Sequence, residues 1–183
     1  NVAELSGPFQ LSRPTIREYI TLLERVFLLE ELAPWHSNRL SRLIKSPKLH
    51  LCDTGLACAL LGVDGAALWN DRQLYGQLLE TFVFQELRRQ AGWLEEPVAF
   101  YHYRDKEGLE VDVVLEFGGQ RLAGVAVKAS STVGAADFKG LLRLQKSAGK
   151  RFAVGVVLYD GDAVASFGDG LLAVPLSMLW KMP

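Results

Sequence analysis

The sequence predicts an α/β protein in two parts, a small helix-and-strand module followed by a mixed sheet flanked by helices. Three observations lead to this class. Apolar residues recur at helical spacing early in the chain, short Val- and Leu-rich runs in the second half have the composition of strands, and glycine-containing turns separate those runs. A chain of 183 residues, 49% of them apolar and 22% charged, is long enough to bury a core and too apolar to be disordered.

Composition excludes several classes of function. A formal net charge of −1 argues against a wholly basic nucleic-acid coat protein, although a local basic patch is compatible with it. No apolar run is long enough to span a bilayer and none follows a basic start, so we expect a cytoplasmic protein without a membrane partner. Cys52 and Cys58 have the spacing of neither a zinc site nor a disulfide framework, which predicts two small buried residues. The chain begins at Asn1 without a methionine, and we expect it to be part of a longer protein.

Residues 1–71 are predicted to form the first part. Thr15 and Glu18 have the spacing of a capping box, and they open a helix with an apolar face. The segments 27–32 and 48–53 have the composition of two short strands on either side of a basic stretch. Helix, strand, basic segment and strand in this order are typical of the second half of a winged helix-turn-helix, so we expect a winged-helix-like N-terminal module.

This module has the means to contact DNA, because a winged helix places one helix in the major groove while basic side chains contact phosphates. Its preceding helix would be the segment 1–7. The stretch 39–48 carries basic residues and no acidic one, as either a solvated loop or a phosphate-contacting surface. Glu18 and Glu24 would oppose DNA contact, and winged helices also bind proteins, so both partner classes stay open. The candidate nucleic-acid-binding residues are Arg13, Arg17, Arg39, Arg42, Lys45 and Lys48.

Residues 72–183 are predicted to form the second part, a mixed sheet flanked by helices. A compact helix over 53–62, capped by Asp53 or Thr54 and ended by Gly62, precedes it. The expected elements of the second part are a long helix over 72–92, strands over 98–103, 109–117 and 121–129, a helix over 135–147, a buried strand over 151–160 and a short terminal helix opened by Pro175.

Four charged residues stand out in these elements: Glu80 on the long helix, Glu110 and Asp112 on the second strand, and Lys128 on the third. Because side chains alternate along a strand, Glu110 and Asp112 should share one face. A two-residue glycine turn between the second and third strands would bring Asp112 and Lys128 together on the same face. A charge in an apolar strand is costly unless it is paired, so this juxtaposition predicts a functional site or a buried ion pair.

The order of elements and acids resembles the PD-(D/E)XK nuclease superfamily, which implies a restriction-endonuclease-like αβββαβ sheet. The resemblance implies Asp112 and Glu80 as metal ligands, Glu110 as a further acid, and Lys128 as the catalytic lysine. Mg²⁺ would be the cofactor, activating a water that the lysine orients. The acid expected two residues before the lysine is Ala126 here, so one metal ligand is missing. Glu80 would otherwise be a plain ion-pair partner, and Asp112 with Lys128 a pair retained from a nuclease ancestor.

The whole chain resembles the C-terminal region of a prokaryotic family of AAA+-like ATPases. The segments that carry the resemblance are TIREYITLLERVFLLEELAPW, KSPKLHLCDTGLA, GQLLETFVFQEL, YHYRDKEGLEVDVVLE and VAVKASST, in that order. The resemblance implies a P-loop ATPase core elsewhere in a longer protein. This chain has no GxxxxGK[ST] run, so we do not expect it to bind ATP through a Walker A loop.

The preferred hypothesis is a C-terminal nucleic-acid- or partner-binding domain of a prokaryotic ATPase, with a degenerate nuclease-like site. Binding by this domain would be coupled to the ATPase core. One alternative is a Mg²⁺-dependent DNA endonuclease that uses Asp112, Lys128 and either Glu80 or Glu110. The other is a protein–protein interaction module without DNA affinity.

Overall fold

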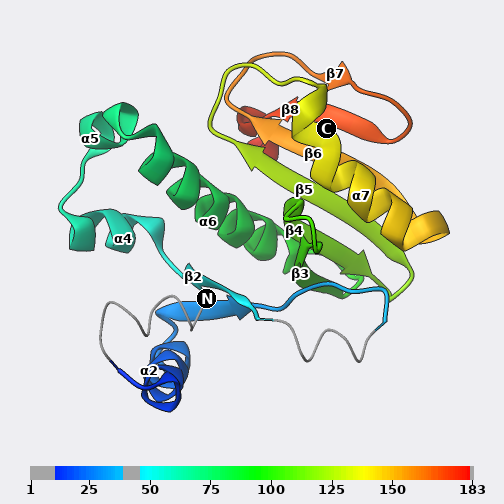
Figure 1. Cartoon of the computed structure of the whole chain (residues 1–183). Coiled ribbons are helices and arrows are strands. Elements are labelled where there is room, and N and C mark those ends of the chain that lie inside the picture. Colours follow the sequence, from blue (N-terminus) through cyan, green and yellow to red (C-terminus); the bar gives the residue numbers. More distant parts are fainter. Residues whose placement is uncertain (1–10, 39–45, 182–183) are drawn as a thin grey trace.

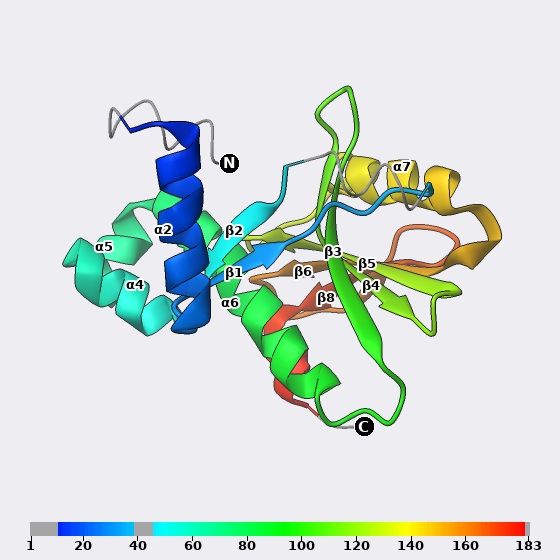
Figure 2. The ribbon, with the colours of Figure 1, turned by 90° about the horizontal axis from the view of Figure 1, so that it is seen from below.

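The structure, a computed structural model, describes residues 11–38 and 46–181 (Figure 1). Its larger part is a six-stranded mixed sheet between helix α6 (Arg72–Ala91) and helix α7 (Lys139–Ala148). A two-stranded sheet and the helices α2 (Arg13–Arg25), α4 (Thr54–Leu61) and α5 (Gly65–Asn70) lie to one side of it (Figures 1 and 2). The predicted α/β class, with a mixed sheet flanked by helices, is confirmed.

The large sheet has the strand order β3-β4-β5-β6-β8-β7. Strand β4 is antiparallel to both β3 and β5. Strands β5, β6 and β8 run parallel to one another, and β7 is antiparallel to β8. Short 3₁₀ turns η1 (Ala135–Phe138) and η2 (Gly149–Arg151) flank α7, and η3 (Leu176–Trp180) follows the last strand. The strands are β3 (Val98–Arg104), β4 (Glu110–Phe117), β5 (Arg121–Lys128), β6 (Phe152–Tyr159), β7 (Ala165–Ser166) and β8 (Leu171–Pro175).

Each face of the sheet has its own apolar core. Under α7, Leu141 packs in a buried cluster with Val157, and under α6, Phe84 packs in a second cluster with Val125. Period-two alternation along β5 and β6 supplies both clusters, because successive side chains point to opposite faces. A residue on β4 or β5 can therefore be assigned to a face by the cluster that its neighbours join.

The first part of the chain shares these cores. Strands β1 (Leu29–Leu32) and β2 (Lys48–Leu51) form an antiparallel pair. Leu32 joins the cluster under α6, and Trp35 joins the cluster under α7 and donates its backbone N–H to the His102 carbonyl at 2.6 Å. Helix, strand and strand therefore follow one another as expected. The winged-helix assignment and the boundary after residue 71 stay predictions, and the helix proposed for 1–7 lies outside the described residues.

Helix α2 begins earlier than its sequence suggests, and a residue of left-handed conformation follows its C-cap. Ser12 is the N-cap and accepts a hydrogen bond from the Thr15 N–H at 3.3 Å, so the predicted capping box of Thr15 and Glu18 is wrong. After the helix, Phe27 has a φ of 59° and does not belong to the following strand. A non-glycine residue in this left-handed region costs about 1–2 kcal/mol.

The connecting helices agree with the sequence in part. Asp53 caps α4, accepting from the Leu56 N–H at 2.6 Å, and Gly62 ends it with a φ of 66°, as predicted. Helix α5 was not predicted. Cys52 and Cys58 are free and partly exposed, so the expectation of two buried cysteines is wrong.

Two details of the second part correct the sequence reading. The β4–β5 connection pairs Phe117 with Arg121 and so contains three residues, of which Gly118 and Gly119 have positive φ. Strand β8, which was not predicted, runs parallel beside β6. Its alternating burial shows that one of its faces packs on the core.

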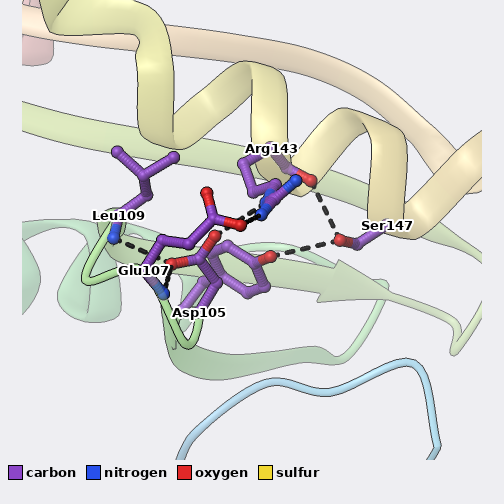
Figure 3. A network of polar contacts seen from close by, with 6 residues as sticks. Asp105, Glu107, Leu109, Arg143 and Ser147 are labelled. Atoms are coloured by element: carbon purple, nitrogen blue, oxygen red, sulfur yellow. Dashed lines mark hydrogen bonds and ion pairs between the residues drawn. The ribbon is translucent and has the colours of Figure 1, made fainter.

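A polar network anchors the β3–β4 turn to α7 (Figure 3). The Asp105 carboxylate accepts from the backbone N–H groups of Glu107 and Leu109 at 2.8 and 2.9 Å, which closes the turn. Arg143 of α7 donates to Asp105 at 2.7 Å and also pairs with Glu107. Although burial acts in the opposite direction, hydrogen bonds from Arg143 and from the turn hold the pKa of Asp105 below its usual range. The network fixes the end of β4 at which Glu110 lies.

Candidate functional site

A β-bulge in β4 decides where Asp112 points. Between two regular pairs of partners, β3 contributes His102 alone, whereas β4 contributes both Asp112 and Val113. The extra residue interrupts the alternation of side chains along the strand. Val113 belongs to the cluster under α6, and Asp112 interacts on that side too. Its Oδ2 accepts a hydrogen bond from the Val127 N–H at 2.9 Å, so the side chain replaces part of the β4–β5 ladder.

Lys48, the first residue of β2, places its ammonium group among three carboxylates. Its Nζ lies 3.3 Å from Oδ1 of Asp112, 3.6 Å from Oε2 of Glu80 and 3.6 Å from Oε2 of Glu110. We call these four residues the Lys48 cluster. Glu110 has a second partner, Arg104, at 3.0 Å. The cluster joins β2 to α6 and β4, which are distant in sequence, so it ties the first part of the chain to the large sheet.

One ammonium group cannot neutralise three carboxylates, and the cluster shows this imbalance in its titration. Burial opposes the charge on Lys48, but Asp112, Glu80 and Glu110 together outweigh burial and raise the pKa of Lys48. Burial, with the repulsion of Asp112, raises the pKa of Glu80 to about 7 despite Lys48. Asp112 receives the ammonium group at the shortest distance and a backbone N–H as well. Protonation of Glu80 is therefore favoured by its position in the cluster.

A pocket of about 800 Å³ opens beside the Lys48 cluster. The buried His50 lies next to it, with Nδ1 3.0 Å from the Thr81 hydroxyl and its ring against Phe84. Burial, together with the nearby Lys48 charge, lowers the pKa of His50 to about 4, so the ring is neutral at pH 7. The pocket walls carry both signs of charge: Lys48, Arg104 and Lys106 against Glu80, Asp105 and Glu110.

Lys128 does not join the cluster. It shares its face of β5 with Ala126, which is buried under α7, and its Nζ lies 3.3 Å from Oδ1 of Asp137. Asp112 and Lys128 thus lie on opposite faces of the sheet, and the predicted pocket shared by these two residues is wrong. The prediction assumed strict alternation along β4, and the bulge at Asp112 breaks that alternation.

The Lys48 cluster does not fit a metal ion. Within residues 11–38 and 46–181, no three His, Cys, Asp or Glu side chains are arranged to hold one. The Lys48 ammonium group stands where a cation would meet the carboxylates of Glu80, Glu110 and Asp112. Mg²⁺ requires near-octahedral oxygen ligands and gives up its waters reluctantly, so an ammonium group among the ligands excludes it. The sequence-predicted acids do come together, but around a lysine.

Three of the six candidate phosphate contacts lie within the described residues. Arg13 is exposed at the start of α2, whereas Arg17 pairs with Glu31 of β1. The Lys48 side chain, 24% exposed, is already paired with carboxylates, and its role as a phosphate contact stays a prediction. The remaining three candidates, Arg39, Arg42 and Lys45, lie outside the described residues.

Sequence reasoning missed that Lys48 belongs to the acidic site. A signal was available, because Lys48 opens a strand that carries no acidic residue, and a half-buried charge at such a place needs a partner. Its partners are 32 or more positions further along the chain, and nothing in the local sequence identifies them. The acids alone suggested a metal, since the cation that meets them comes from the other part of the chain.

The raised pKa of Glu80 predicts how Glu80→Gln responds to pH. The folded state binds the proton of Glu80 more tightly than the unfolded chain does. The stabilisation that this proton gives the folded state is therefore complete below about pH 4.5 and is lost as the pH rises through about 7. Glutamine mimics the protonated acid at every pH. We therefore expect the melting temperature of Glu80→Gln, relative to that of the wild type, to be higher at pH 8 than at pH 5. Thermal unfolding followed by circular dichroism measures it, and an equal difference at both pH values would contradict the assignment.

The fold and site define a mixed α/β domain whose clustered carboxylates share the ammonium group of a lysine from its own N-terminal strand pair. The chain belongs to the family described as Domain of unknown function (DUF4143), which matches residues 75–179. A second family, described as Domain of unknown function (DUF8612), matches residues 1–67. In the described part of the chain, no helix combines the length and the apolar character needed to cross a membrane.

Similar proteins are longer than this chain. Uncharacterized proteins of Mycobacterium tuberculosis and Mycobacterium bovis are each 29% identical to it over 179 residues, covering 97% of this chain and 38% of each relative. The chain thus spans well under half the length of these relatives. A solved assembly of Thermococcus gammatolerans McrB AAA+ hexamers with bound McrC matches 55% of this chain and 27% of its own, at 14% identity and a TM-score of 0.41. A TM-score of this size does not establish a shared fold.

Proposed function

We propose that this chain is the C-terminal partner-binding domain of a larger prokaryotic ATPase, and that its nuclease-like site is structural and not catalytic. The observation that carries the proposal is the position of Lys48, whose ammonium group lies within 3.6 Å of three carboxylates. A nuclease site needs those carboxylates for a metal and a lysine for the reacting water. Here the carboxylates already have a cation, and Lys128 lies on the other face.

The ATPase context rests on the sequence resemblance, and the length of the relatives supports it. They match this chain almost end to end. Because the match covers 38% of each relative, the other 62% of its length is left for other domains. A domain without its own chemistry in such a protein would recognise a partner and transmit that binding to the ATPase core.

A protein partner is favoured over DNA by the described residues. Of the six candidate phosphate contacts, Arg17 and Lys48 are already engaged with carboxylates of the same chain. Phosphate contacts dominate nucleic-acid affinity, so each cation that is held internally weakens the case for DNA. DNA binding would have to rest on Arg13 and on the segment that the structure does not describe.

Incubation with supercoiled plasmid in a Mg²⁺ and Mn²⁺ titration tests the proposal. We expect no cleavage at any metal concentration, and no binding of duplex DNA at low salt, where phosphate contacts are strongest. Asp112→Asn serves as the site variant, and Asp137→Asn, at the carboxylate that faces Lys128, is the matched control. Cleavage that Asp112→Asn abolishes and Asp137→Asn retains would overturn the structural reading and restore the endonuclease.

A further inference from the structure

Helix α2 has two apolar faces, and the described fold uses one of them. Ile16 and Ile20 are buried, on the side of the helix whose Arg17 pairs with Glu31 of β1. A second set lies at positions i, i+3, i+4 and i+7, which form one stripe along a helix. All members of this stripe are exposed, by 38% to 60%: Tyr19, Leu22, Leu23 and Val26.

Phe27 extends this stripe beyond the end of the helix. It occupies the position after the helix C-cap that glycine usually takes, with a φ of 59°, and it is the one non-glycine residue of positive φ in the described ranges. The Leu28 N–H bonds to the Leu23 carbonyl at 3.0 Å, which closes the last turn around it. The side chain of Phe27 is 84% exposed. The fold thus holds a large apolar residue in a strained conformation without burying it.

Strain of this kind is found where a residue serves a function. The stripe and Phe27 together make a continuous apolar ridge, which we call the α2 ridge: Tyr19, Leu22, Leu23, Val26 and Phe27. Both figures of the ribbon show α2 at the periphery, with the β1–β2 hairpin between it and the large sheet (Figures 1 and 2). The ridge is accordingly open to an element that comes from outside the described fold.

We infer that the α2 ridge is the docking surface for an amphipathic helix from the ATPase part of the longer protein. This inference rests on the proposed function and names its contact. A straight stripe at helical spacing fits the groove of a second helix. The exposed Glu18 and Arg25, seven residues apart and therefore on one side of the stripe, give the rim both signs of charge. A rim of mixed sign suits a protein partner better than a phosphate backbone or an anionic lipid surface.

The length of the relatives supplies the source of that helix. In proteins that match 97% of this chain, the matched region is 38% of the whole, so most of each relative lies outside it. A helix covalently joined to the domain also meets the ridge at a high effective concentration, so it does not need a large surface to stay docked. A second copy of this chain is the competing occupant, and the experiment separates the two.

Hydroxyl-radical footprinting with mass spectrometry tests the inference on the full-length protein and on the 183-residue chain. We expect the labelling rates of Tyr19 and Phe27 to fall at least fivefold in the full-length protein. Trp93, which is 80% exposed and outside the ridge, is the internal control and should label equally in both. Equal labelling of Tyr19 and Phe27 in both proteins would overturn the inference. Protection of these residues in the short chain that grows with its concentration would assign the ridge to a second copy.

Phe27→Gly separates docking from folding. Glycine relieves the left-handed strain, so we expect the short chain to melt about 2–4 °C higher. In the full-length protein the same change should raise Tyr19 labelling several-fold, because the anchor is lost. A variant that melts lower, or leaves Tyr19 protected, contradicts the role assigned to Phe27. ATP hydrolysis by the full-length protein is measured separately: its absence removes the proposed function, whereas the footprint decides the docking surface.

Discussion

Lys48→Met should destabilise the folded chain by about 2 kcal/mol at pH 8, because it leaves half-buried carboxylates without their cation, in a site that solvent screens in part. Asp112 and Glu80 would then repel each other in a site that is partly shielded from water. Methionine keeps most of the length and apolar volume of the lysine, so the loss reports on the charge. Urea unfolding followed by circular dichroism measures it.

The pH dependence of this loss is the sharper test. With Lys48 gone, the pKa of Glu80 should move further above 7, and protonation of Glu80 at pH 5 should relieve much of the repulsion. The cost of Lys48→Met should therefore shrink between pH 8 and pH 5. Lys128→Met is the matched control, since Lys128 faces one carboxylate at 44% exposure and its removal should cost under about 1 kcal/mol. Equal costs for the two variants would show that the Lys48 cluster does not hold the hairpin to the sheet.

Gly140→Ala should cost about 3 kcal/mol or prevent folding, because it drives α7 away from β4. A Cβ built at Gly140 would overlap the carbonyl oxygen of Glu110. Both groups belong to the backbones of packed elements, so neither can give way as a flexible side chain would. The displacement would also move Glu110 relative to Lys48. Urea unfolding of the purified variant measures the loss.

Gly134→Ala provides the control for this substitution. A Cβ at Gly134 meets nothing within 4 Å, and the residue lies six positions earlier, in the connection that leads to α7. We expect a change within about 0.5 kcal/mol there, as for most exposed substitutions. If Gly140→Ala were as stable as Gly134→Ala, the close packing of α7 on β4 would be disproved.

Local signals in the sequence predict most of the elements of the large sheet. The helices α6 and α7 and the strands β3 to β6 follow apolar periodicity, and Gly62 ends α4 as its αL preference requires. The misses have local causes too. Ser12 competes with Thr15 as the cap of α2. Strand β8 follows a glycine-rich segment, and it is stabilised by its parallel neighbour β6.

The candidate site was predicted as a set of residues but not as an arrangement. Glu80, Glu110 and Asp112 do meet, because α6 packs on the face to which the bulge turns Asp112. Asp112 was expected on the face of Lys128, but a single inserted residue in β4 turns it to the other face, and no composition signal marks that insertion.

The amino-acid order alone therefore specifies helices, strands, caps and the identity of the charged residues, because these depend on neighbours within a turn or two. The partner of each charge was settled by folding. Lys48 rather than Lys128 meets the acids because the β1–β2 hairpin packs beside α6, and that contact joins residues 32 to 64 positions apart. Pairings over such separations depend on which surfaces are buried together, and short-range periodicity does not predict them.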